Sequence, residues 1–301
     1  MIRAALALCL AAGGAWADIA AITSQNADAL TLVDTDGPSI LASVPLPGKP
    51  APVAVDGPRG RILAIAVETA RLHVFDLSGK PLADWPLPGA PFGLAVRHAT
   101  GTVLVTDQAG ARLREIDPAT GRELQHWATG ALPSGLATED DIIVVANRDG
   151  DSVSLINGTT SLEIPVGHHP FGVTLLAGRA FVTNVLSDSV SVIDLPGARV
   201  IATIPTEERP YAIAFSAGRG FVTNQYDASL TVFDAGTLEV IGRIETDEYP
   251  EGIATAADGR VFVANWFSDS LQVVDPLSLT ITDSLEMPSG PRAFGAFIGA
   301  P

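Results

Sequence analysis

The chain has 301 residues and a formal net charge of −16, from 18 basic and 34 acidic residues. This acidity argues against nucleic acid and anionic lipid as partners, because both are bound through clustered Lys and Arg. Apolar residues make up 47% of the chain, enough for a packed core, and the single cysteine is Cys9 near the N-terminus. We therefore expect no disulfide and no thiolate metal site in the folded domain.

Residues 1–17 have the pattern of a secretory signal peptide. Arg3 precedes a short apolar run, and the segment ends in small residues at Ala15-Trp16-Ala17. We expect cleavage after Ala17, a folded domain over residues 18–301, and a periplasmic or secreted location. No later segment approaches the roughly twenty consecutive apolar residues of a spanning helix, so we expect no membrane insertion.

The rest of the chain is a unit of about forty residues repeated seven times. Two independent markers keep this count. An acidic or amide residue closes the third strand of each unit at Asp34, Asp76, Asp117, Asn157, Asp194, Asp234 and Asp275. A proline opens the next unit at Pro50, Pro91, Pro133, Pro170, Pro210, Pro250 and Pro291.

Each unit contains four short strands, as residues 178–216 illustrate. A β-branched run at 180–184 is followed by a hairpin loop and by Ser189–Asp194, which alternates polar and apolar residues. Another run ends at Ile204, and the proline-led run 210–215 completes the pattern. No segment has sustained helical spacing, so each unit predicts one blade of a β-propeller.

The two ends of the chain predict how the ring closes. The domain begins in the middle of a unit at 19–23, and it ends on the proline-led run Pro291–Phe297. The final run therefore supplies the missing first strand of the N-terminal blade, which would pair two otherwise exposed edges. We predict an all-β, seven-bladed propeller with four antiparallel strands per blade, one blade being shared by both termini.

The repeats resemble the YVTN family of β-propeller proteins. FVTN at 181–184 and 221–224, and FVAN at 262–265, match its name-giving strand, and SVSVID at 189–194 matches its third strand. PFGV at 170–173 and PEGI at 250–253 match its first. The resemblance implies an exported propeller, similar to secreted seven-repeat proteins associated with PQQ-dependent alcohol oxidation. Amine dehydrogenase large subunits are similar propellers that scaffold a small, cofactor-bearing subunit.

The residues after the seven prolines are expected to surround one mouth of the central channel. Ala51, Phe92 and Ser134 form a bland arc, whereas Phe171, Tyr211, Glu251 and Arg292 form an aromatic and charged one. Aromatic side chains beside paired opposite charges are typical of interaction surfaces. We predict a site for a protein partner or a small ligand there, formed by His169, Phe171, Arg209, Tyr211, Tyr249, Glu251, Trp266 and Arg292.

Catalysis remains an alternative at the same mouth. A hydrolase or lyase would use His169 or Glu251 as general base, with Arg292 stabilising developing negative charge. The adjacent His168 and His169 point to opposite sides of an extended chain, which disfavours a shared metal ion. The recurrent Asp28, Asp151, Asp188 and Asp269 occupy one hairpin position, where Asp bonds nearby backbone amides.

We therefore expect a monomeric, non-catalytic binding or accessory protein with no metal and no cofactor, linked to a periplasmic quinoprotein or alcohol oxidation pathway. The alternatives are a hydrolase or lyase and a scaffold subunit of a periplasmic dehydrogenase.

Overall fold

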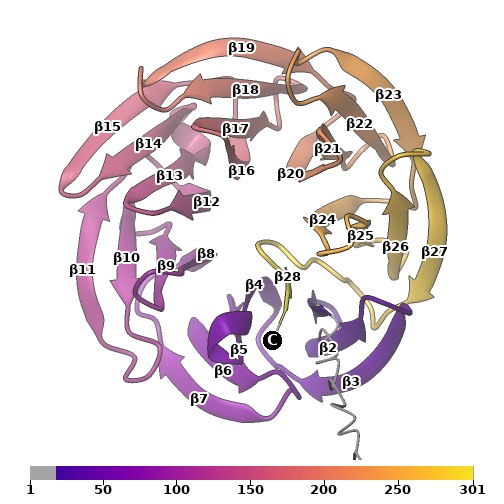
Figure 1. The fold of residues 1–301 in the computed structure, drawn as a ribbon. Helices are drawn as coiled ribbons and strands as arrows, with labels where there is room; N and C mark the ends of the chain where they lie inside the picture. Colours follow the sequence, from indigo (N-terminus) through magenta and orange to yellow (C-terminus); the bar gives the residue numbers. More distant parts are fainter. Residues whose placement is uncertain (1–17, 301) are drawn as a thin grey trace, which may run out of the picture.

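The computed structural model describes residues 18–300, which form seven four-stranded sheets around a central axis (Figure 1). The predicted signal peptide, residues 1–17, lies outside the described residues. Within residues 18–300, no helix has the length and hydropathy needed to cross a membrane.

The seven sheets are numbered as blades in chain order, with the strands of each blade given from the axis outward. Blade 1 holds β28 (Ile298–Gly299), β1 (Ile19–Ser24), β2 (Ala29–Asp34) and β3 (Ser39–Pro45). Blade 2 holds β4 (Pro50–Asp56), β5 (Arg61–Ala66), β6 (Arg71–Asp76) and β7 (Pro81–Pro86). Blade 3 holds β8 (Pro91–Arg97), β9 (Thr102–Asp107), β10 (Arg112–Ile116) and β11 (Glu123–Ala128). Blade 4 holds β12 (Pro133–Glu139), β13 (Ile142–Asn147), β14 (Ser152–Asn157) and β15 (Thr160–Pro165).

The remaining blades repeat this order. Blade 5 holds β16 (Pro170–Leu176), β17 (Arg179–Asn184), β18 (Ser189–Asp194) and β19 (Arg199–Pro205). Blade 6 holds β20 (Pro210–Ser216), β21 (Arg219–Asn224), β22 (Ser229–Asp234) and β23 (Val240–Glu245). Blade 7 holds β24 (Pro250–Thr255), β25 (Val261–Asn265), β26 (Ser270–Asp275) and β27 (Thr280–Glu286). Two short 3₁₀ turns, η1 (Gly57–Arg59) and η2 (Arg148–Gly150), lie in loops.

Burial follows the position of a strand within its blade. The two middle strands are covered by neighbouring blades on both faces, so β17 and β18 are buried along nearly their whole length. The outermost strand β19 is mostly exposed. The core therefore lies between blades, as where Phe181 of blade 5 packs against Phe233 of blade 6. The predicted seven-bladed architecture is confirmed.

Blade 1 is completed by the end of the chain, as predicted, but with a different geometry. Regular pairing is confined to Ile298–Gly299 against β1 and to a bridge between Pro291 and Ser24. Between these points the backbone leaves the strand line, and β4 donates from Val53 and Val55 to the carbonyls of Phe294 and Ala296. The predicted continuous strand Pro291–Phe297 is therefore wrong in detail, because Ala293 (φ 44°) and Gly295 (φ 121°) bulge toward the channel.

Neighbouring blades are joined where their innermost strands come closest to the axis. Thr183 of β17 accepts a hydrogen bond from the Gly172 amide (2.8 Å) and donates to the Tyr211 carbonyl of the next blade (3.0 Å). Thr106 makes the same pair of contacts with Gly93 and Ser134. A Cβ added at Gly172 would overlap the Tyr211 carbonyl oxygen. The close approach of blades 5 and 6 therefore requires glycine there.

The recurrent aspartates at one hairpin position hold the blade junctions. Asp28, Asp151, Asp188 and Asp269 all have positive φ, and their carboxylates accept hydrogen bonds from backbone amides of the following junction. The Asp151 carboxylate, for example, accepts from the His169 amide at 2.8 Å. Their structural role in the turns is as the sequence predicts.

Gly172→Ala should destabilise the protein by about 1–3 kcal/mol, because the new methyl group meets backbone that cannot move independently of the ring. Urea unfolding of the variant measures this loss. Gly37→Ala is the matched control, since a Cβ there meets nothing within 4 Å, and we expect a change within about 0.5 kcal/mol. Equal stabilities for the two variants would contradict the proposed close packing.

Candidate functional site

The innermost strands begin at one face of the wheel, and the residue after each opening proline lies beside the axis. This face is called the mouth. A cavity of about 430 Å³ opens there, bounded by residues of blades 3 to 7 and by Arg292 of the C-terminal segment. Seven of the eight predicted site residues line it: His169, Phe171, Tyr211, Tyr249, Glu251, Trp266 and Arg292.

A hydrogen-bonded network of Tyr211, Gln225, Glu251 and Arg292 forms the base of the cavity, and we call it the polar floor. The Glu251 carboxylate accepts from Arg292 at 2.5 Å (Nε) and 3.2 Å (Nη2), and from Gln225 Nε2 at 2.7 Å. Arg292 Nη2 also donates to the Tyr211 hydroxyl at 2.9 Å, and its Nη1 donates to Gln25 Oε1 at 3.2 Å. Both carboxylate oxygens and all three guanidinium nitrogens are thus engaged.

Burial and charge act against each other in this network. Burial raises the pKa of Glu251, which is only 3% exposed, and the opposing effect of Arg292 does not fully offset it. Burial alone would lower the pKa of Arg292, but Tyr211 and Glu251 outweigh that effect and raise it. Burial also raises the pKa of Tyr211. Arg292 therefore stays charged and Tyr211 stays protonated at neutral pH.

An aromatic cluster closes the channel below the polar floor. Phe171 packs against Tyr211 and Phe294 with ring centroids 4.1 and 5.0 Å apart, and Phe92 lies 5.6 Å from Phe171. The far side of this cluster faces a second cavity of about 530 Å³ within the channel, lined mainly by apolar residues. The cavity at the mouth therefore ends at the aromatic cluster instead of running through the wheel.

The walls of the mouth cavity come from the blade junctions and from the loops after the second strands. His169 and Tyr249 have φ values of 57° and 62° and directly precede the opening prolines. Lys49 and Leu132 share this conformation at the equivalent positions, so it belongs to the repeat and carries no functional meaning. Arg148 makes no side-chain hydrogen bond within residues 18–300, and its one ion pair, with Asp149, is long at 3.6 Å.

Arg209 is the predicted site residue that does not line the cavity. Its guanidinium lies 5.4 Å from the ring centroid of Tyr226, and its Nη1 donates to the Val185 carbonyl at 3.5 Å. Sequence reasoning left Phe92 in a bland arc, which is wrong because it joins the aromatic cluster. It also left Gln225, Arg148 and Gln25 out of the site. Gln225 and Arg148 directly follow the second strand of their blades, like Trp266, and the sequence places all three loops at the mouth, but only Trp266 was predicted as a site residue.

No metal centre is formed by the described part of the chain. Within residues 18–300, no three His, Cys, Asp or Glu side chains gather as ligands. His168 instead contacts Asp151 through Nδ1 and Oδ2 at 2.7 Å. Burial and the nearby Arg148 lower the pKa of His169, which is therefore neutral at pH 7.

Comparison with solved structures finds the same fold in proteins of different kinds. A functionally unknown protein from Desulfotomaculum acetoxidans superposes with a TM-score of 0.78 at 14% identity, covering 94% of this chain and 98% of that one. Virginiamycin B lyase from Staphylococcus aureus gives a TM-score of 0.69 at 17% identity, with coverage of 83% and 92%. Dihydro-heme d1 dehydrogenase NirN, in complex with DHE, gives 0.67 at 17% identity, with coverage of 89% and 63%.

The similarity to these solved structures is a similarity of fold. No family model matches the chain, and no curated protein matches its sequence. The seven-bladed β-propeller is therefore the level at which the chain is classified, and its neighbours include catalysts.

Removing only Arg292 from the polar floor should lower the free energy of unfolding more than removing both Arg292 and Glu251. Arg292→Met leaves the Glu251 carboxylate buried without its counter-charge, for an expected loss of about 3–5 kcal/mol. Adding Glu251→Met should recover part of that loss, and a double-mutant cycle by urea unfolding measures it. The control cycle uses the exposed pair Arg243–Glu245, whose coupling we expect below about 1 kcal/mol. Additive losses at Glu251 and Arg292 would contradict the buried pairing.

His169 should make the protein less stable in mild acid. Its folded pKa is lowered, so the unfolded chain binds more protons as pH falls below about 6.5, and stability is lost from there down through the lowered pKa. His169→Asn removes this titration and keeps a residue that tolerates positive φ. Unfolding profiles of the two proteins should converge at high pH and separate below it. Parallel profiles would show that His169 titrates normally.

Proposed function

We propose that the protein is an exported binding protein that holds a small ligand, or a protruding group of a protein partner, in the cavity at its mouth. The observation that carries this proposal is the polar floor. Its carboxylate, guanidinium, hydroxyl and amide groups are fixed by one another, so the base of the cavity keeps its shape without a ligand. A preformed concave surface with a few placed polar groups is characteristic of binding sites.

The chemistry of the cavity walls suggests what the bound group offers. Trp266, Tyr249 and Phe92 give flat apolar surfaces, and the Arg148 guanidinium has donors that no described side chain accepts. A flat apolar body with a hydrogen-bond acceptor or an anionic group fits this combination.

The same geometry favours binding over the alternative of a hydrolase or lyase. A general base needs an oxygen lone pair that reaches the substrate, but Glu251 is only 3% exposed and its carboxylate already accepts three hydrogen bonds, two of them from its counter-ion Arg292. Arg292 likewise uses four of its five N–H donors within the polar floor, in bonds to Glu251, Tyr211 and Gln25. His169 lines the cavity and is neutral, but within the described chain no second side chain hydrogen bonds to its ring to orient it.

The proposal also includes where the protein acts in the cell. The signal-peptide pattern of residues 1–17 supports export to the periplasm or beyond. The resemblance to YVTN repeats supports an accessory role beside periplasmic quinoprotein oxidation, with the protein acting as a monomer.

A retention experiment tests the proposal. The purified protein is incubated with a small-molecule extract of the source organism, washed, and its bound compounds are identified by mass spectrometry. We expect one compound class retained by the wild type and lost in Arg148→Ala and Trp266→Ala. Glu68→Ala, at an exposed loop position of blade 2 on the same face, should retain it. Retention that is equal in all four proteins, or absent from the wild type, would contradict binding in this cavity.

A further inference from the structure

The rim of the mouth differs from one side to the other at a single repeated position. Two residues after the second strand, blades 1 to 4 carry Asn26, Glu68, Ala109 and Asp149. At the same position, blades 5 to 7 carry Leu186, Tyr226 and Phe267, which are 53%, 58% and 63% exposed. We call these three residues the rim crescent. Because the same loop carries polar residues or alanine in the other blades, the fold does not require an exposed apolar side chain there.

The two aromatic members of the crescent, Tyr226 and Phe267, are part of a continuous surface of packed aromatic side chains. Tyr226 contacts Tyr249 with ring centroids 5.3 Å apart, and Tyr249 contacts Phe267 at 6.2 Å. Trp266 and Phe267 are 5.9 Å apart. At these separations the rings pack against one another and leave no slot between them. They form a platform that suits a broad contact, not a cage around a small ion.

The crescent is held in place by the backbone. The amides of Leu186, Tyr226 and Phe267 donate to the carbonyls of His168 (3.1 Å), Glu208 (3.4 Å) and Glu248 (3.4 Å). Each exposed side chain is thus presented from a loop that is tied to its own blade junction. Presenting apolar groups on fixed loops lowers the ordering cost of binding.

The junctions beside the crescent are acidic. They carry Glu207 and Glu208 before blade 6, and Asp247 and Glu248 before blade 7. None of these four carboxylates forms an ion pair with another described residue, although Asp247 accepts a hydrogen bond from Ser270.

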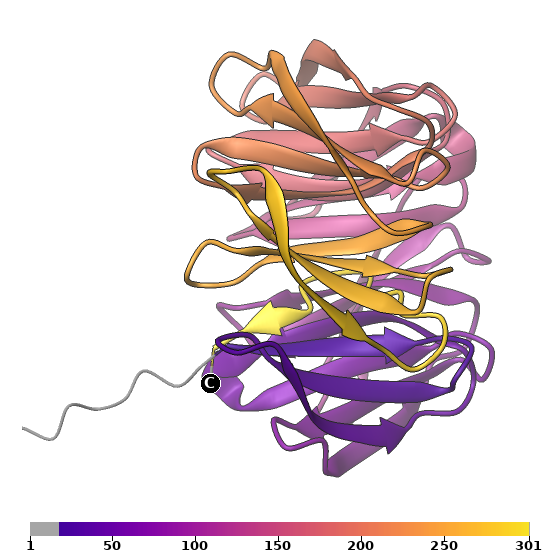
Figure 2. The ribbon, with the colours of Figure 1, turned by 90° about the vertical axis from the view of Figure 1, so that its right-hand side faces the viewer.

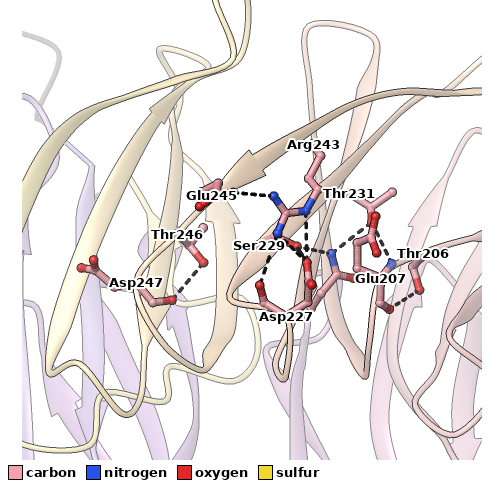
Figure 3. A network of polar contacts seen from close by, with 10 residues as sticks. Thr206, Glu207, Asp227, Ser229, Thr231, Arg243, Glu245, Thr246 and Asp247 are labelled. Atoms are coloured by element: carbon pink, nitrogen blue, oxygen red, sulfur yellow. Dashed lines mark hydrogen bonds and ion pairs between the residues drawn. The ribbon is translucent and has the colours of Figure 1, made fainter.

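The nearest basic side chains on these blades are already committed. Figure 3 shows Arg243 between Asp227 and Glu245, with nitrogen–oxygen distances of 2.8 Å to each. Arg209 lies over the Tyr226 ring and not over the junction carboxylates. The crescent is therefore an exposed apolar platform beside four junction carboxylates, with the single positive charge of Arg209 over one of its rings.

We propose that the rim crescent docks a basic segment of a partner protein, one that carries Lys or Arg beside aromatic or aliphatic residues. The apolar side chains of such a segment would cover Leu186, Tyr226 and Phe267, and its cations would face Glu207, Glu208, Asp247 and Glu248. A polar cation alone would leave the crescent uncovered, and an apolar segment alone would leave the carboxylates unpaired. Leu186, Tyr226 and Phe267 do not line the cavity, although Tyr226 and Phe267 contact Tyr249 and Trp266, which do.

Peptide binding tests the docking proposal. The probe is a fluorescent synthetic peptide of alternating Lys with Leu and Trp, and binding is followed by anisotropy at low and high salt. One control peptide replaces Lys by Glu, and another replaces Leu and Trp by Ser. We expect binding of the first peptide alone, weakened by salt.

Two pairs of substitutions locate the contact. Tyr226→Ser with Phe267→Ser, and separately Glu208→Lys with Glu248→Lys, should each weaken peptide binding about tenfold or more. Glu68→Lys makes one such charge reversal on the same face of the wheel, in the loop after the second strand of blade 2, and should leave binding nearly unchanged. The unfolding midpoint of each variant serves as the folding control. We expect these midpoints to stay unchanged, because the substituted positions are exposed.

Three results would overturn the proposal. Equal weakening by Glu68→Lys would indicate attraction to the whole acidic protein. Equal affinity for the Ser peptide would indicate that the crescent contributes nothing. Binding of a neutral oligosaccharide at the crescent without salt dependence, together with no peptide binding, would assign the platform to carbohydrate.

Discussion

The structure depends on a hydrogen bond from a threonine hydroxyl of one blade to a backbone carbonyl of the next. In blades 1, 3, 5 and 6 a threonine near the end of the second strand donates to the carbonyl that follows the next opening proline: Thr23 to Ala51, Thr106 to Ser134, Thr183 to Tyr211 and Thr223 to Glu251. These carbonyls belong to the same residues whose side chains surround the mouth. The contact that spaces the blades therefore also positions the site, because backbone and side chain share one residue.

Closure by the C-terminal segment has a similar double effect. The bulge at Ala293 and Gly295 completes blade 1 less regularly than a full strand would. In return it places Phe294 against Phe171 and Tyr211, and it brings Arg292 to Glu251. The end of the chain thus supplies part of the base of the cavity, and an open ring would lack both the charge partner of Glu251 and part of the aromatic cluster.

The periodic markers in the sequence predicted the number of blades, the strands and their order because each marker reports a local turn or strand end. They also predicted the mouth residues, since position after a proline fixes proximity to the axis. They could not predict the pairing of Arg292 with Gln25, which are separated by 267 positions, nor the orientation of Phe92. Such contacts depend on the relative rotation of whole blades, which no single repeat encodes.

The placement of the two chain ends has a practical consequence. Ile19 pairs with Gly299 at one end of β1, whereas Ser24, at its other end, lies beside Pro291 and the mouth. In the side view of Figure 2, the yellow strand β28 lies at one edge of the wheel. A tether, tag or fused domain attached at residue 18 or 300 would extend from the face opposite the mouth. A protein immobilised through either of these residues would keep its mouth exposed to solvent.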